Sequence, residues 1–221
     1  MKIATWNIER LKRKSALIEI NSLLEELYTD ILVLTETDSR VHLPQFQTCL
    51  TANPLTELDV TNCRKTEHRI AIYTNYQVVN QFETYDKNTS LCIELATPWG
   101  NLIVYGTIIG IYGNRNPNFK IDLLQQIEAI KLLSTKGNFC FIGDYNTSFS
   151  DNYYFTNYGR NSLNKAFEKN NLKLVTRNQP ECIDHIAISK YFISDKSIEI
   201  DEWNLDKKLS HHNGIAVHLK S

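Results

Sequence analysis

Phe139-Cys140-Phe141-Ile142-Gly143-Asp144-Tyr145-Asn146-Thr147 joins four apolar residues to a glycine, an acid and an amide. The apolar run is typical of a short buried strand. A carboxylate at the end of a core strand loses hydration, so Asp144 needs a cation, a hydrogen-bond network or a substrate beside it. The alternative is a turn in which Asp144 and Asn146 cap their own backbone. The rest of the chain has to decide between these two interpretations.

Length and composition limit the classes of protein to consider. The chain has 221 residues, a net charge of −1 and five cysteines without CxxC spacing. Without a linker or repeat, this length predicts a single domain over residues 1–221. Unpaired cysteines indicate a reducing compartment, so we expect a cytoplasmic protein. We also expect a monomer. No apolar run approaches the ~18 residues of a membrane-spanning segment, and we expect no signal peptide.

Strand and helix patterns alternate along the chain. Apolar runs and alternation predict strands over residues 2–6, 31–34, 46–50, 69–73, 77–82, 90–96, 101–109, 139–142, 172–175, 182–189, 197–203 and 215–219. Helical spacing predicts helices over residues 15–28, 119–134 and 163–169. Residues 148–161 are predicted to form a polar, aromatic loop.

Polar residues stand at an end of five of these strands. They are Asn7, Glu36, Asp144 with Asn146, Asp184 with His185, and His212. Five such coincidences in one domain predict that the strand ends converge on one pocket. Its donors, mostly oxygens with no cysteine, suit a hard divalent ion such as Mg²⁺ or Mn²⁺. Such an ion with a nearby base can direct water at phosphorus.

The same segments resemble the endonuclease/exonuclease/phosphatase superfamily in their order and approximate spacing. The matching motifs are Thr5-Trp6-Asn7-Ile8, Leu34-Thr35-Glu36-Thr37, Ile142-Gly143-Asp144-Tyr145-Asn146, Ile183-Asp184-His185-Ile186 and Ser210-His211-His212. The superfamily includes pancreatic deoxyribonuclease, abasic-site endonucleases of the exonuclease III type, inositol polyphosphate 5-phosphatases and neutral sphingomyelinases. The resemblance covers essentially the whole chain. It implies an α+β fold, a four-layer α/β/β/α sandwich of two packed mixed β-sheets flanked by helices, with the site along one edge.

The resemblance also implies catalytic roles. Asp144 would orient or deprotonate the attacking water, and Asn146 would hold a phosphate oxygen. His212 would contact the scissile phosphate and stabilise charge in the transition state. Asp184 would fix the tautomer of His212.

Glu36 would be the principal ligand of the metal, with Asn7 beside it supporting metal and phosphate. This chain departs from the family pattern at two positions. Where the family commonly has Ser-Asp-His, the sequence has His211 in place of the acid, and we include His211 among the metal ligands. This change is expected either to weaken Mg²⁺ binding or to favour a softer ion such as Mn²⁺, which tolerates nitrogen ligands better. Where many members place a catalytic His or Tyr, the sequence has Ile108. Two residues of the following loop, Tyr112 and Arg115, are then candidates to contact the substrate phosphate.

These residues predict a divalent-metal-dependent phosphodiester hydrolase, a nuclease acting on DNA or RNA through metal-assisted attack of water on phosphorus. Arg69 is a further candidate for substrate binding, and the aromatic loop at 153–158 is suited to stacking on bases. One alternative is a phosphomonoesterase or phospholipid-type hydrolase of the same superfamily that takes a small phosphorylated molecule. Another is a catalytically weakened binding domain. His185 is expected to be structural.

Overall fold

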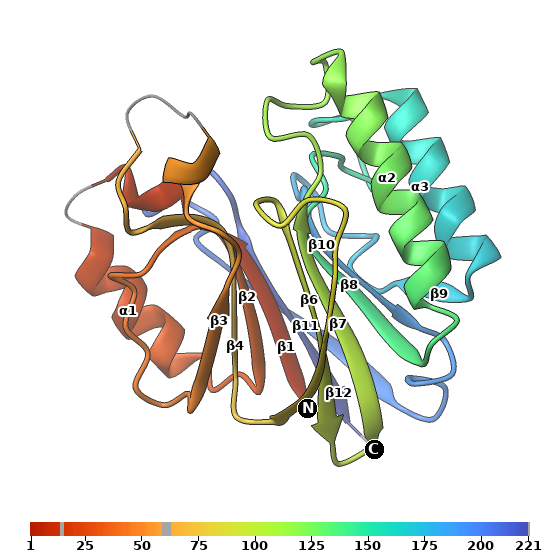
Figure 1. Cartoon of the computed structure of the whole chain (residues 1–221), viewed down its shortest axis with the longest axis horizontal. Coiled ribbons are helices and arrows are strands. Elements are labelled where there is room, and N and C mark those ends of the chain that lie inside the picture. The colour runs from red at the N-terminus through yellow and green to blue at the C-terminus, as the bar shows by residue number, and fades with distance from the viewer. Residues whose placement is uncertain (14–15, 59–62, 221) are drawn as a thin grey trace.

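Two six-stranded sheets pack face to face in the computed structural model, which describes residues 1–13, 16–58 and 63–220 (Figure 1). The strand order is β11-β12-β1-β2-β4-β3 in the first sheet and β5-β6-β7-β8-β10-β9 in the second. Helices cover both outer faces. This is the predicted four-layer α/β/β/α sandwich with mixed sheets.

The first sheet places the two ends of the chain side by side. It consists of β1 (Lys2–Asn7), β2 (Ile31–Asp38), β3 (Thr48–Thr51), β4 (Glu67–Thr74), β11 (Ser197–Trp203) and β12 (Gly214–Lys220). β1 runs parallel to β2 and antiparallel to β12. The β1–β2 pair is buried on both faces, which explains its continuous apolar runs.

The second sheet is built around the parallel pair β7 and β8. It consists of β5 (Gln77–Phe82), β6 (Ser90–Thr97), β7 (Gly100–Ile108), β8 (Asn138–Asp144), β9 (Leu172–Leu174) and β10 (Asp184–Ser189). β10 runs antiparallel to β8, so β10 begins where β8 ends.

Three apolar clusters separate the four layers. Branched side chains such as Val33, Ile72 and Val104 fill the space between the two sheets. α1 (Ala16–Glu26) packs its Ile20 and Leu24 against the outer face of the first sheet. α2 (Asn118–Leu133) and α3 (Asn157–Lys169) cover the second sheet.

Most predicted bounds lie within two residues of the observed ones, but those of two elements were wrong by four residues or more. α3 begins at Asn157, inside the predicted loop 148–161, because the Thr156 side chain caps it by accepting a hydrogen bond from Gly159 N at 3.0 Å. A helix signal is weak here because the first turn contains a glycine. β2 continues to Asp38, four residues past its predicted end, so Glu36 lies within the strand. Residue 15, the predicted start of the first helix, lies outside the described residues.

The topology brings the polar strand ends together at one edge. β1 and β8 end at this edge with Asn7 and Asp144, while β10 begins there with Asp184. Residue 212 precedes β12, which runs antiparallel to β1 and so also begins at this edge. In the part of the chain that is described, no helix has the length and apolar character needed to span a bilayer.

Candidate active site

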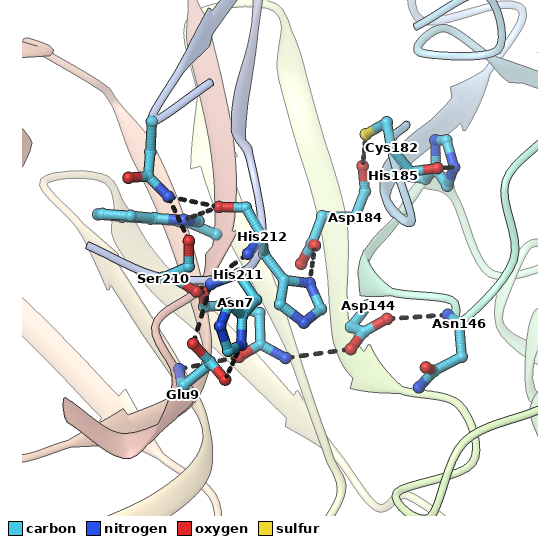
Figure 2. Close-up of polar contacts among 12 residues, drawn as sticks. Asn7, Glu9, Asp144, Asn146, Cys182, Asp184, His185, Ser210, His211 and His212 are labelled. Carbon is cyan, nitrogen blue, oxygen red and sulfur yellow. Dashed lines mark hydrogen bonds and ion pairs between the residues drawn. The ribbon is translucent and has the colours of Figure 1, made fainter. Parts of the chain in front are cut away.

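His212 and Asp184 form a close pair that links the two sheets. His212 Nδ1 lies 2.6 Å from Asp184 Oδ2, and the Asp184 side chain is 1% exposed (Figure 2). The main chain of His212 is fixed because Trp6 Nε1 donates to its carbonyl oxygen at 2.9 Å. Burial alone would lower the pKa of His212, but the charge and hydrogen bond of Asp184 raise it to about 9. At neutral pH His212 is therefore an imidazolium whose Nδ1 donates to Asp184.

Asp144 faces Asp184 across the antiparallel β8–β10 pair. Its two oxygens accept hydrogen bonds from Asn7 Nδ2 at 3.0 Å and from the backbone amide of Asn146 at 2.8 Å. Burial, and then the negative charge of Asp184, raise the pKa of Asp144 in spite of these two bonds and of the nearby His212. A carboxylate with a raised pKa is a better proton acceptor near neutral pH than an ordinary aspartate.

These three side chains form one cluster. Asp144, Asp184 and His212 each offer a ligand atom, and these atoms lie within 4.8 Å of one another. Asp184 Oδ1 is buried and has no hydrogen-bond partner among the described residues. A buried acceptor without a partner is costly, so this oxygen is available to a water molecule, a cation or a donor group of a substrate.

Glu36 is not part of this cluster but lies at the same edge, on the strand next to Asn7. Asn7 pairs in register with Thr35, so Glu36 follows Asn7 at the same edge. Its backbone is in the left-handed region, with φ at 44°, although it belongs to a strand. Strained backbone of this kind is retained where the surroundings fix it, often at functional sites. Glu36 Oε1 accepts a short hydrogen bond from Arg69, and Glu36 Oε2 lies 3.6 Å from Arg10 Nε.

The predicted substrate-binding Arg69 is therefore placed against a carboxylate. Its side chain is 6% exposed, compared with 16% for Glu36. Arg69 holds the orientation of Glu36 in this structure, and a direct contact with substrate stays a prediction.

Asn7 and Asn146 both support Asp144. The Asn7 side chain bridges two groups, because its Oδ1 accepts from Glu9 N at 2.9 Å while its Nδ2 donates to Asp144. Asn146 has φ at 48°, and its Nδ2 donates to the carbonyl oxygens of Ile109 and Gly110 at 3.0 and 3.3 Å. Both asparagines lie at the site as predicted, and their contacts with metal and phosphate stay predictions.

His211 pairs with Glu9, a residue that the sequence analysis did not select. Its backbone amide donates to Glu9 Oε2 at 2.9 Å, and its Nδ1 lies 3.1 Å from Glu9 Oε1. The His211 ring is 73% exposed. Burial would raise the pKa of Glu9, but the amide and charge of His211 lower it overall. Glu9 follows Asn7 by two residues, and this proximity to a selected motif was the only available signal.

The loop after β7 holds one further residue that the sequence analysis missed. Asn114 is buried, and its Nδ2 donates to the Asn146 carbonyl oxygen at 2.7 Å. The predicted phosphate-binding residues of this loop, Tyr112 and Arg115, are exposed at the surface. Ile108 pairs in register with Asp144 and packs in the core between the sheets, as an apolar side chain should.

His185 has the structural environment expected for it. It is fully buried, with Nδ1 at 2.9 Å from Thr176 Oγ1 and Nε2 at 3.1 Å from the carbonyl oxygens of Thr147 and Cys182. Burial lowers its pKa to about 4, so the ring is neutral. Figure 2 shows that it points away from His212.

The donors at this edge fit a hard divalent cation. Glu36, Glu9 and Asp184 provide carboxylate oxygens, and Asp184 Oδ1 is buried with no hydrogen-bond partner in the part of the chain that the structure describes. Two guanidinium groups face Glu36 and offset its negative charge, so a cation that binds there has to compete with them. Oxygen donors of this kind are the ligands that Mg²⁺ and Mn²⁺ prefer.

Two packed mixed sheets with carboxylates, amides and a His–Asp pair at one edge define a class of protein, the deoxyribonuclease-I-like phosphoester hydrolases. The chain belongs to the Endonuclease/Exonuclease/phosphatase family, whose sequence model matches residues 4–201. Members of this family hydrolyse phosphoester bonds. A search of curated proteins found no significant match to the sequence.

Solved structures of the same fold include proteins that act on DNA. An AP endonuclease from Archaeoglobus fulgidus has a TM-score of 0.73 at 14% identity, with 100% of both chains covered. A 3′ phosphatase from Neisseria, NExo, bound to product DNA hairpin, has a TM-score of 0.70 at 17% identity, again with 100% of both chains covered. The endonuclease domain of TRAS1, a telomere-specific non-LTR retrotransposon, has a TM-score of 0.66 at 15% identity, with 100% of this chain and 98% of that chain covered. At these identities the likeness shows the fold alone.

Proposed function

We propose that this chain is a divalent-metal-dependent phosphodiester hydrolase and that its substrate is nucleic acid. The observation that carries the proposal is the His212–Asp184 pair at 2.6 Å beside the buried Asp144. This set brings together a positively charged imidazolium, that of His212, and a proton acceptor, the carboxylate of Asp144. An AP endonuclease, a 3′ phosphatase bound to product DNA hairpin and a retrotransposon endonuclease share this fold, which supports nucleic acid as the substrate.

Each residue of the proposed site has a role that follows from its chemistry. Glu36 and Asn7, with His211 at the rim, would hold the divalent ion. When bound, the ion neutralises charge on the phosphate and makes phosphorus more electrophilic. Asp144 orients the attacking water and takes its proton. The imidazolium of His212 stabilises the charge that develops on the phosphoryl oxygens.

The remaining residues keep these groups in place. Asp184 accepts from His212 Nδ1 and so leaves Nε2 directed at the substrate. The Asn146 backbone amide holds Asp144 Oδ1 in position, and Asn114 holds the carbonyl group of Asn146. Asn146 is also proposed to bind a phosphate oxygen.

Removal of the divalent ion is expected to abolish turnover. The test uses supercoiled plasmid, single-stranded DNA, abasic duplex, RNA, bis-p-nitrophenyl phosphate and p-nitrophenyl phosphate, each with Mg²⁺, with Mn²⁺ and with EDTA. We expect cleavage of at least one diester with either ion, and none with EDTA, since an uncompensated phosphate repels the carboxylates of the site.

The other outcomes separate the alternatives. Hydrolysis of p-nitrophenyl phosphate without any diester would favour a phosphomonoesterase, an activity that the neighbouring 3′ phosphatase makes worth testing. A folded protein that binds Mn²⁺ and hydrolyses none of the substrates would contradict the nuclease proposal and favour a binding domain.

The pH dependence of kcat is expected to be bell-shaped. Activity should rise as Asp144, with its raised pKa, loses its proton, and it should fall as the pH passes the His212 pKa of about 9. Since Asp184 is the group that raises the pKa of His212, Asp184→Asn should move the alkaline limb to lower pH and also reduce kcat. Measuring kcat between pH 5 and pH 10 for both proteins tests this, and an unchanged alkaline limb in the variant would contradict the role of the pair.

A further inference from the structure

Glu36 is held by two arginines, and the two contacts differ in kind. Arg69 approaches Oε1 within hydrogen-bonding distance and is nearly buried. Arg10 Nε lies 3.6 Å from Oε2, which is an ion-pair distance but not a hydrogen bond. Arg10 Nε is buried and has no hydrogen-bond partner among the described residues. The Arg10 contact is therefore the weaker of the two.

Arg10 is also shared with a second carboxylate. Its Nη1 donates to Glu67 Oε2 at 3.3 Å, and the Glu67 side chain is only 7% exposed. Glu67 stands at the start of β4, two residues before Arg69. The guanidinium of Arg10 thus lies between Glu36, the proposed metal ligand, and Glu67, which has no part in the proposed chemistry.

The backbone turns Arg10 toward these two acids. Glu9, Arg10 and Leu11 all lie in the left-handed region, with φ values of 50°, 56° and 53°, directly after the strand that carries Asn7. Residues with a side chain avoid this region unless the surroundings fix them. The ion pairs with Glu36 and Glu67 are contacts that can fix it here.

We propose that Arg10 competes with the divalent cation for Glu36, and that Glu67 retains Arg10 when the cation is bound. The proposal rests on the proposed function, because it takes Glu36 as a metal ligand. Arg69 already donates to Oε1, so Oε2, the oxygen that faces Arg10, is the one for which a cation would compete with Arg10. A cation there repels Arg10 and weakens its pair with Glu36, while the pair with Glu67 keeps the guanidinium from becoming an unpaired buried charge. Arg10 thereby lowers the affinity for the ion, and Glu67 limits this effect.

The test is calorimetric titration of Mn²⁺ into the full chain without substrate. Arg10→Gln should tighten Mn²⁺ binding on the order of tenfold, because one competing charge near the carboxylate is lost. Glu67→Gln should weaken it, because Arg10 then has Glu36 as its remaining acid partner. Arg10→Lys keeps the charge and should remain close to the wild type. Lys131→Gln is the control for loss of a paired positive charge, because Lys131 pairs with Glu128 on the exposed face of α2 and its loss should leave Mn²⁺ affinity unchanged.

Two further proteins make the result decisive. The double variant Arg10→Gln/Glu67→Gln should bind Mn²⁺ like Arg10→Gln alone, since Glu67 acts through Arg10, and fully additive effects would overturn the inference. Glu36→Gln should bind Mn²⁺ weakly. If Glu36→Gln binds like the wild type, the proposed metal site itself fails. If it loses binding while Arg10→Gln and Glu67→Gln leave the affinity unchanged, the competition is overturned and the metal site stands. Circular dichroism of each variant confirms folding.

Discussion

Glu36→Gln is expected to reduce kcat by at least about 10³-fold, which corresponds to roughly 4 kcal/mol of transition-state stabilisation. An amide has no net charge, so it holds the divalent ion that neutralises the phosphate much more weakly than a carboxylate does. The fold should remain, because the amide oxygen can still accept the hydrogen bond that Glu36 Oε1 accepts from Arg69. The melting temperature should fall, since Arg69 then lacks a buried counter-charge. Steady-state kinetics and thermal unfolding followed by circular dichroism measure the two effects.

A matched control separates the loss of this carboxylate from the loss of any surface charge. Glu199→Gln makes the same chemical change on β11, where Glu199 is exposed and pairs with Lys220. It should leave kcat and the melting temperature unchanged. Unchanged turnover in purified Glu36→Gln would contradict the proposed mechanism.

Asp144→Asn is expected to reduce kcat by about 10²- to 10⁴-fold, the usual range for loss of a general base. Asparagine matches the shape of aspartate but cannot accept a proton from water. Its effect on stability should be small at pH 8, because two changes oppose each other. One hydrogen bond from Asn7 or Asn146 is lost, while repulsion between Asp144 and Asp184 is relieved.

The pH dependence of stability gives this variant a second test. Because the folded pKa of Asp144 is raised, its ionised form opposes folding above the unfolded pKa, and this penalty grows until the pH exceeds the folded value. Asp144→Asn removes the penalty. The unfolding free energy of the variant minus that of the wild type should therefore increase as the pH rises from the acid range to pH 8. Asp201→Asn, the same change at an exposed position on β11, is the control and should show no such trend.

The sandwich was predictable from the sequence because its signals are local. Apolar runs located the strands, and polar residues at strand ends marked the edge where the site lies. Glycine in the first turn weakened the helix signal at the start of α3, and the packing of Gly159 against Phe119 that offsets it is a tertiary contact.

The contacts between the site residues were harder to predict from the sequence. Asp184 and His212 are 28 residues apart, and their contact depends on how two sheets pack. Glu9 and Arg10 have no sequence pattern that marks them as site residues. Their role depends on the left-handed backbone at both positions, where Glu9 pairs with His211 and Arg10 pairs with Glu36 and Glu67. Charge networks of this kind follow from tertiary contacts, which a single sequence does not display.

Hydrolysis in ¹⁸O-labelled water tests whether this chain directs water at phosphorus. The diester that is cleaved best in the substrate panel is incubated with the wild-type protein and Mn²⁺, and the products are examined by mass spectrometry. We predict one ¹⁸O atom in the phosphate product for each bond broken, none in the alcohol product, and no cleavage with EDTA. Cleavage that leaves the phosphate product unlabelled, or that persists in EDTA, would contradict metal-dependent attack of water on phosphorus.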